Sequence, residues 1–541
     1  MAPFAVPSTF FILFLIFVMP SHSENTRRIA KNTLMLYVRM LFGMLVSLYT
    51  SRVVLQALGV EDYGIYNVVG GLVGMFSIIS GSLSASVSRF LTFELGRGGG
   101  ERLDRIFSTA VWIFIFIAFV VFVLTETAGL WFLNTHMAIP HDRILAANWV
   151  FHLSVSGFML ALFSIPYNAS IVAHERMSAF AYIGILEVLL RLAVVLFIAY
   201  VPVAADHLVV FGFLQLAVYI LLQAIYWVYC HRHFPECRIR WCFDRRYWRE
   251  MSTFAGWNFI GASSAILRDA GGNVVLNMFC GPMLNAARGI SQQVNNAVTG
   301  FSNNFLTAAN PQITKSYAAD DRDYMLSLIF RVARFSFYLL LALSLPIMFN
   351  TEFILAAWLK TVPGHTSDFV RLVLVYSILE SISSPLVTVM LATGRIRNYQ
   401  LVVGGLQMMN LPLTYVSLRM GAVPESILVI AIVLSVCCLV ARLVMLRGMV
   451  GLPVRRFVRQ VIGNVTAVTV LAMILPLLFG YCVPLAGWTG FILSSVICLL
   501  SASTVIYFVG CSNGERRFIC SKLVAVANKT LRRCSGGRFS R

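Results

Sequence analysis

The sequence has little charge for its length. Only 12% of its 541 residues are Asp, Glu, Lys or Arg, whereas 59% are hydrophobic. A soluble domain carries about 25% charged residues, so this composition excludes an ordinary soluble protein. The alternation of apolar and polar residues that membrane β-barrels need is also missing. The apolar residues come in long continuous runs instead, and these predict an all-α, polytopic membrane protein.

Motifs for several kinds of chemistry are missing as well. There is no G-x-x-x-x-G-K-[ST] loop for ATP phosphates and no H-E-x-x-H pair for zinc catalysis. The 11 cysteines follow no regular spacing in polar loops, so no disulfide framework is predicted. Cys230, His231, His233, Cys237 and Cys242 carry zinc-binding atoms, but their spacing fits no familiar zinc finger. We therefore expect no enzyme activity, no metal and no cofactor.

The hydropathy pattern predicts 14 membrane spans, each about 20 residues or longer. They are expected at 33–56, 63–88, 106–132, 145–173, 179–201, 208–229, 250–279, 284–311, 327–349, 369–392, 397–418, 426–446, 460–479 and 488–509.

The net charge of +19 raises the alternative of a nucleic-acid partner. The positions of the charges favour another explanation, because cytoplasmic loops of membrane proteins accumulate Lys and Arg. With both termini in the cytoplasm, the inside segments hold about 33 of the 42 Lys and Arg. One span more or fewer would move every later loop to the opposite side of the membrane, and the positive charges would no longer gather on the cytoplasmic side. The charge pattern therefore supports 14 spans with cytoplasmic termini, and no nucleic-acid partner is expected.

The spans fall into two halves with similar patterns. Gly59-Val60 precedes the second span and Gly281-Pro282 precedes the eighth, at an offset of about 222 residues. Six spans return the chain to the same side, so the halves are predicted to be parallel repeats. The predicted parts are an N-terminal extension (1–22), an N-terminal six-helix bundle (23–230), a cytoplasmic linker (231–249), a C-terminal six-helix bundle (250–450), two extra helices (451–510) and a basic cytoplasmic tail (511–541).

The extension 1–22 contains an apolar stretch at 10–18 that is similar to the core of a signal peptide. No Lys or Arg precedes this stretch, as a signal peptide requires. Cleavage would also place Arg27, Arg28 and Lys31 outside, against the rest of the charge pattern. We interpret these residues as an extension, with a signal peptide as the alternative.

Cations within the spans carry the strongest functional signal. Arg39 lies in the first span and Arg268 in the seventh, while Arg52 and Arg288 lie near span ends. Such a charge costs about 2.5–3.5 kcal/mol on insertion scales and usually faces a bundle interior or a watery cavity. Guanidinium groups suit phosphate because their planar fork donates two hydrogen bonds at once. The alternative for Arg52 and Arg288 is that they reach to the membrane surface.

Two of the spans are unusually polar. The seventh contains Arg268 and Asp269, which point about 100° apart on a helix and are not expected to form one clean pair. The eighth contains Asn295 among several other Asn and Gln residues. Helices this polar cannot face lipid all round. We therefore expect Asp269 and Asn295 to line a cavity together with the four arginines.

Acids in other spans allow ion coupling or simple neutralisation. Glu126 and Glu380 are candidates for binding Na⁺ or H⁺, and helix–helix hydrogen bonding is the alternative. Glu187 and Arg191 are spaced i,i+4 on the fifth span, which predicts an internal ion pair.

The N-terminal region resembles a known family. The segment RIAKNTLMLYVRMLFGMLVSLYTSRVVLQALGVEDYGIYNVVGG, and above all LGVEDYGIYNVVGG at Leu58 to Gly71, is similar to the start of Wzx-type oligosaccharide flippases. These belong to the multidrug/oligosaccharidyl-lipid/polysaccharide (MOP) exporter superfamily. The resemblance extends more loosely over residues 24–450. It implies two six-helix bundles around a central cavity, often with two extra C-terminal helices.

The resemblance also implies a function. Such proteins move an undecaprenyl-pyrophosphate-linked oligosaccharide across the bacterial inner membrane for O-antigen, capsule or exopolysaccharide, by alternating access. By position in the first helix of each half, Arg39 and Arg268 match the cations thought to hold the pyrophosphate. The implied partners are the lipid-linked oligosaccharide, membrane lipid, and a polysaccharide polymerase and glycosyltransferases.

Three rival functions stay open at the sequence level. A lipid II flippase shares the same layout and a cationic cavity. A cation-coupled drug exporter of the MATE type predicts acids in the cavity, whereas arginines predominate here. A membrane-embedded glycan transferase or polymerase needs a large polar loop with catalytic carboxylates, and no predicted outside loop is long enough.

Overall fold

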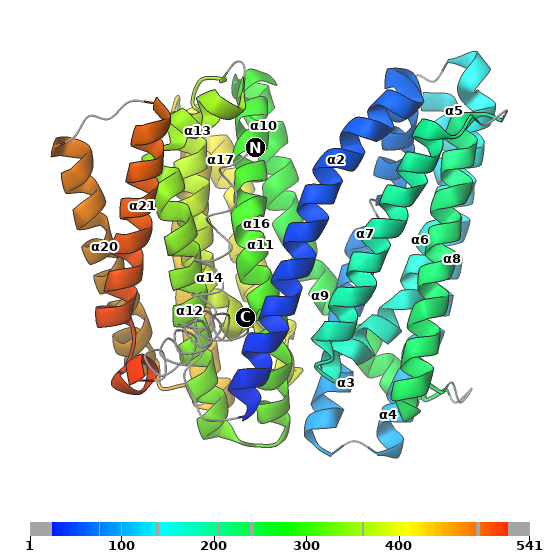
Figure 1. The fold of residues 1–541 in the computed structure, drawn as a ribbon. Helices are drawn as coiled ribbons and strands as arrows, with labels where there is room; N and C mark the ends of the chain where they lie inside the picture. The colour runs from blue at the N-terminus through cyan, green and yellow to red at the C-terminus, as the bar shows by residue number, and fades with distance from the viewer. Residues whose placement is uncertain are drawn as a thin grey trace, which may run out of the picture. The chain divides into compact units, whose positions relative to one another are not determined.

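The computed structural model describes residues 24–74, 76–98, 100–136, 140–202, 205–238, 243–280, 282–359, 362–482 and 487–517. All regular structure within these ranges is helical, as predicted for an all-α protein (Figure 1). The predicted extension 1–22 lies outside the described residues, and so does the predicted tail after residue 517.

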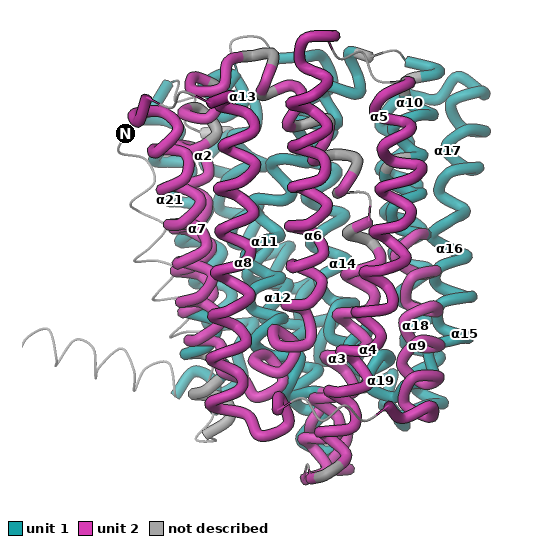
Figure 2. Tube along the Cα trace, turned by 90° about the vertical axis from the view of Figure 1, so that its right-hand side faces the viewer, with its two compact units in different colours: residues 1–34, 264–313, 321–541 teal, residues 35–263, 314–320 magenta. Residues whose placement is uncertain are grey.

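The chain divides into two compact units, which are coloured separately in Figure 2. Unit 2 comprises residues 35–263 and 314–320, and unit 1 comprises residues 1–34, 264–313 and 321–541. The predicted domain boundaries stay predictions. The segment predicted as a linker at 231–249 is partly helical, because one helix ends at His233 and the next begins at Arg245.

Unit 2 is built from long helices joined by short turns. Helix α6 packs against α3 and α8, and α7 packs against α8. The helices that contribute to it are α2 (Glu24–Gly74), α3 (Ser77–Gly96), α4 (Glu101–Leu124), α5 (Leu130–His136), α6 (Ile144–Ala173), α7 (Met177–Tyr200), α8 (His207–His233) and the first part of α9 (Arg245–Ile266).

A sharp turn interrupts α2 at Gly59. The backbone there has φ 80° and ψ 171°, a conformation that residues with a Cβ rarely adopt. The sequence predicts the end of the first span and the start of the second around this position. The turn therefore separates two helical segments within Glu24–Gly74, and the glycine is required by its backbone angles.

Unit 1 contains the remaining helices. Helix α14 packs against α12 and α18, while α20 packs against α21 and α21 against α12. Its helices are α10 (Gly272–Cys280), α11 (Pro282–Ala318, apart from 314–320), α12 (Arg322–Phe349), α13 (Thr351–Trp358), α14 (Thr366–Thr393), α15 (Arg397–Tyr399), α16 (Gly405–Met408), α17 (Asn410–Arg419), α18 (Ser426–Val450), α19 (Val454–Phe457), α20 (Gly463–Cys482) and α21 (Gly487–Val505).

Ten helices among the described residues are long and apolar enough to cross a membrane. The other four predicted spans, at 33–56, 63–88, 250–279 and 284–311, also fall largely on helical residues. The protein is thus a multi-pass membrane protein, and the count of 14 stays a prediction.

Candidate functional site

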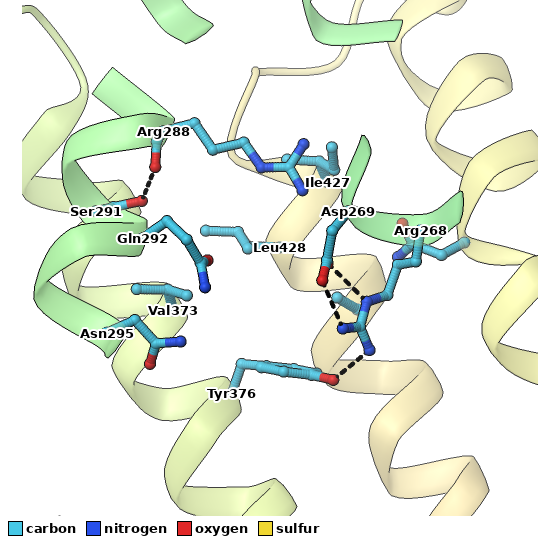
Figure 3. Close-up of a pocket in the computed structure, with 12 residues that line it drawn as sticks. Arg268, Asp269, Arg288, Ser291, Gln292, Asn295, Val373, Tyr376, Ile427 and Leu428 are labelled. Atoms are coloured by element: carbon cyan, nitrogen blue, oxygen red, sulfur yellow. Dashed lines mark hydrogen bonds and ion pairs between the residues drawn. The ribbon is translucent and has the colours of Figure 1, made fainter. Parts of the chain in front are cut away.

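A polar pocket lies within unit 1, between α11, α14, α17, α18 and the π-helix Leu267–Gly271 that joins α9 to α10 (Figure 3). It contains about 530 Å³ of empty space, part of which is open solvent. Four of the six cavity residues predicted from the sequence line it, namely Arg268, Asp269, Arg288 and Asn295. Residues from the seventh and eighth predicted spans therefore meet at one place.

The prediction that Arg268 and Asp269 form no clean pair is wrong. Nε of Arg268 donates to Oδ1 of Asp269 at 2.9 Å, and Nη2 donates to Oδ2 at 3.1 Å. The 100° separation applies to a regular α-helix, but these residues lie in a π-helix, and the long arginine side chain folds back. Nη1 of Arg268 donates to the hydroxyl of Tyr376 on α14 at 2.5 Å. The charge of Arg268 is therefore matched within the protein.

Arg288 is in a different situation. Its Nη1 is buried and has no hydrogen-bond partner among the described residues. The guanidinium packs against Gly272, where an added Cβ would lie 2.8 Å from Nη1 and 2.9 Å from the Ile427 side chain. Gly272 thus leaves the room that this side chain occupies. In Figure 3 the guanidinium of Arg288 reaches over the pocket toward Ile427, apart from the Arg268–Asp269 pair.

Amide and hydroxyl side chains of α11 form one wall of the pocket. Gln292 is exposed and donates from Nε2 to Oδ1 of Asn296 at 3.1 Å. Asn295 is buried and accepts a hydrogen bond from Ser377 of α14 at 2.6 Å. The amide of Asn295 is therefore fixed to a neighbouring helix, whereas the amide of Gln292 can be reached by a ligand in the pocket.

The other two predicted cavity arginines belong to unit 2. The guanidinium of Arg39 stacks on the ring of Phe180 at 4.4 Å, and it lies against Gly184 of α7. An added Cβ at Gly184 would lie 2.0 Å from Nε of Arg39. Arg52 lies in α2, and its side chain is outside the described part of the structure.

The two acids considered for ion coupling both have partners. Glu126 contacts Nδ1 of His152 at 2.9 Å. Glu380 accepts a hydrogen bond from Ser435 at 2.6 Å and lies 3.0 Å from Nη1 of Arg442. Arg442 is a buried residue of α18 whose side chain is 2% exposed.

The predicted ion pair on the fifth span is confirmed. Nη2 and Nε of Arg191 donate to Oε1 of Glu187 at 3.0 and 3.2 Å. Nη1 of Arg191 also donates to Gln215 of α8 at 3.2 Å.

Part of the signature segment Leu58 to Gly71 is fixed by an ion cluster. Arg143, just before α6, donates to both carboxylate oxygens of Asp62 and, at 2.6 Å, to Asp206. Asp206 also caps α8, because its side chain accepts from the backbone amides of Leu208 and Val209. The segment is therefore tied to the starts of two other helices of unit 2.

One group of side chains could hold a metal ion. Ligand atoms of His365, Asp368 and Glu425 lie within 4.8 Å of one another in unit 1. His365 already contacts Glu425 at 2.5 Å, and Arg371 lies 3.7 Å from Asp368. These contacts satisfy the charges without an ion, and we assign no metal to the group.

The family model for polysaccharide biosynthesis proteins matches residues 27–317. The chain belongs to this family. The match includes the signature segment and both polar helices that supply the pocket, so the family predicted from the sequence is confirmed. No curated protein matches the chain significantly.

Solved structures of the MOP superfamily share the fold. MATE in the straight conformation superposes with a TM-score of 0.68 at 12% identity, covering 81% of this chain and 98% of that one. A multidrug resistance MATE family transporter in an outward-facing conformation gives 0.66 at 12% identity with the same coverage. A MOP superfamily transporter from Pyrococcus furiosus, described as having a binding pocket of reverse polarity, gives 0.65 at 12% identity, again covering 81% and 98%.

The family and the fold together define the class of protein. The chain is a multi-pass helical membrane protein of the polysaccharide biosynthesis family, and its fold is similar to that of solved MOP superfamily transporters.

Sequence reasoning missed two residues of unit 1 that bind the charged side chains. Tyr376 accepts from Arg268, and Arg442 neutralises Glu380. Tyr376 and Glu380 are four residues apart on α14, so they lie on one face of that helix. That spacing was the available signal, since both are polar groups within an apolar span.

Proposed function

We propose that the protein is a flippase that moves undecaprenyl-pyrophosphate-linked oligosaccharide units across the bacterial inner membrane by alternating access. The family match supports a role in polysaccharide biosynthesis, and the fold supports transport. The observation that carries the proposal is the guanidinium of Arg288, which lines the pocket and whose buried Nη1 has no hydrogen-bond partner among the described residues.

Charge accounting favours an anionic cargo group. Arg268 and Asp269 pair with each other, so they add no net charge to the pocket. Arg288 then leaves one positive charge that the lining does not balance. A phosphate oxygen would accept from the buried Nη1 and replace the water that the guanidinium lost on burial. We therefore assign the main pyrophosphate contact to Arg288, with Arg268 as its neighbour in the same pocket.

The amide wall suits the glycan part of the cargo. Exposed amides on a helix within the membrane are tolerated where they line a water-filled cavity. Gln292 offers both a donor and an acceptor, which sugar hydroxyl groups can meet in several orientations. The lipid tail needs no polar contact and can stay in the bilayer.

The test is export of surface glycan by cells that depend on this protein. Arg288→Gln keeps the size and hydrogen-bonding capacity but removes the charge, and we expect surface glycan to fall at least tenfold while lipid-linked intermediates accumulate. Arg371→Gln on α14 is the matched control, because this arginine contacts Glu352 and Asp368 away from the pocket. Normal export with Arg288→Gln, in protein that reaches the membrane at the usual level, would contradict the proposal.

The same strain separates the rival functions. A lipid II flippase would make loss of the protein arrest cell-wall synthesis rather than surface polysaccharide. A MATE-type exporter would lower resistance to cationic drugs. The pocket disfavours the second rival, because its carboxylate, Asp269, is already engaged by Arg268. The same proposal places the protein in the inner membrane with cytoplasmic termini, alongside glycosyltransferases and a polymerase.

A further inference from the structure

Three helices, α2, α9 and α11, have residues in both compact units. Residues 314–320, at the end of α11, belong to unit 2, although the rest of α11 belongs to unit 1. Most of α9, up to Ser263, also belongs to unit 2. Under the predicted topology, residues 314–320 and the beginning of α9 lie at the cytoplasmic ends of their helices. Short segments of the second half of the sequence are therefore packed into the unit formed mostly by the first half.

The closest of these contacts is at Gly96, the last residue of α3. A Cβ at this position would lie 2.8 Å from the Cβ of Ala318 and 2.8 Å from the carbonyl oxygen of Lys315. Two of the three nearest atoms belong to the backbone of α11, which cannot move aside as a flexible side chain can. Only glycine allows α3 and α11 to approach this closely.

An ion pair holds the same end of α11. Nζ of Lys315 donates to Oε1 of Glu175 at 2.7 Å, and the Glu175 side chain is 1% exposed. Glu175 lies in the turn between α6 and α7 with a positive φ of 58°. A buried carboxylate needs a partner, so separating the two residues requires water to enter.

Helix α9 also contacts α3. The hydroxyl of Ser86 donates to the carbonyl oxygen of Met251 at 3.0 Å. The rings of Phe90 and Phe254 pack edge to face at 6.1 Å. Helix α3 is thus held by α9 through these residues and by α11 through Gly96.

We infer that Gly96, Glu175, Lys315 and Ala318 form a latch at the predicted cytoplasmic end of the protein. The latch closes the ends of α3 and of the α6–α7 turn against the end of α11. Resting on the proposed function, the inference states that this latch separates each time the lipid-linked glycan enters from the cytoplasm. A transporter with the latch held shut would keep its fold and lose transport.

A reversible cross-link tests this directly. In the Gly96→Cys/Ala318→Cys variant, a Cβ at position 96 would lie 2.8 Å from the Cβ of residue 318, inside the about 3.5–4.5 Å of a disulfide, so the two helix ends must move apart by about 1 Å for the bond to form. Oxidation by copper phenanthroline with dissolved oxygen converts two thiols to a disulfide and reduces the oxygen. Counting free thiols with a polyethylene-glycol maleimide after denaturation should show two fewer in the oxidised double variant than in the same variant after reduction. Surface-glycan export should fall at least tenfold on oxidation and recover with dithiothreitol.

Each outcome decides the question. A disulfide that forms while export continues at the rate of the single variants shows that these ends need not separate. If no disulfide forms although the double variant reaches the membrane at the usual level, α3 and α11 are not in contact there, because an adjustment of about 1 Å keeps the two thiols within reach. If the unmodified protein exports no glycan, the proposed function fails, while disulfide formation still reports on the latch.

A charge exchange provides a second variant that needs no cysteine. Glu175→Lys and Lys315→Glu should each lower export, because like charges then face each other in a buried site. The double variant restores an ion pair and should recover most of the export. Arg246→Glu is the matched control, since Arg246 and Glu250 form an exposed pair on α9 outside the latch. Additive loss in the double variant would contradict a pairing role.

Discussion

Replacing Glu380 by Gln tests what this buried acid does. Arg442 has a side chain that is 2% exposed, and Glu380 lies 3.0 Å from it. Glu380→Gln keeps the shape and the hydrogen bond from Ser435 but leaves the arginine charge without compensation. Glu380 itself is 28% exposed, so water offsets part of the loss. We expect a cost of about 3 kcal/mol, the lower end of the range for breaking a buried pair.

The measurement is the apparent melting temperature of the purified protein in detergent. A cost of about 3 kcal/mol corresponds to a fall of roughly 6–12 °C for a unit of about 150–250 residues. Glu126→Gln is the matched control, because the side chain of its partner His152 is 44% exposed and the change should cost about 1 kcal/mol or less. Replacing the pair by Glu380→Leu with Arg442→Met should restore most of the stability.

Two results would contradict the prediction for Glu380→Gln. If Glu380→Gln melts within 2 °C of the unmodified protein while export stops, the acid has a transport role and the pair contributes little to stability. If both variants are equally unstable, the burial of Arg442 does not set the cost, and the reasoning fails.

Three further variants probe other contacts. Asp62→Asn removes the carboxylate that binds Arg143, and we expect a loss of about 1.5–3 kcal/mol in unfolding free energy. Gly184→Ala places a methyl group where the guanidinium of Arg39 lies, so it should displace that side chain from the ring it stacks on and reduce export severalfold. A hydrogen bond with Cys230 and burial both raise the pKa of the Cys237 thiol. Less thiolate is then present at pH 7.5, so maleimide should label Cys237 far more slowly than it labels a free cysteine.

Matched controls make these results specific. Gly43→Ala is the control for the second variant, because an added Cβ there meets only Val188 at 3.7 Å, an ordinary contact. Equal effects of the two alanines would show that crowding of the arginine is not the cause. Rapid labelling of Cys237 in the folded protein would contradict its burial, and unchanged melting of Asp62→Asn would show that the ion cluster adds no stability.

The sequence by itself determined the class of the protein. The low charged fraction and continuous apolar runs require a helical membrane protein, because a bilayer leaves backbone groups no partners outside a helix or a closed barrel, and the alternation that a barrel needs is missing. The i,i+4 spacing of Glu187 and Arg191 predicted their ion pair, since spacing along one helix fixes the distance between side chains. The segment LGVEDYGIYNVVGG pointed to the family that the family match then confirmed.

Only the tertiary structure decided which charges are balanced. The sequence favoured Arg39 and Arg268 as phosphate-binding cations and left a membrane-surface position as the alternative for Arg288. In the structure, Asp269 and Tyr376 are partners of Arg268, whereas Nη1 of Arg288 is buried without a hydrogen-bond partner among the described residues. Arg442 shows the same limit, because its partner Glu380 lies on another helix. Partners separated by tens or hundreds of residues leave no periodic signal, so the free charge of the pocket could be found only from the packed helices.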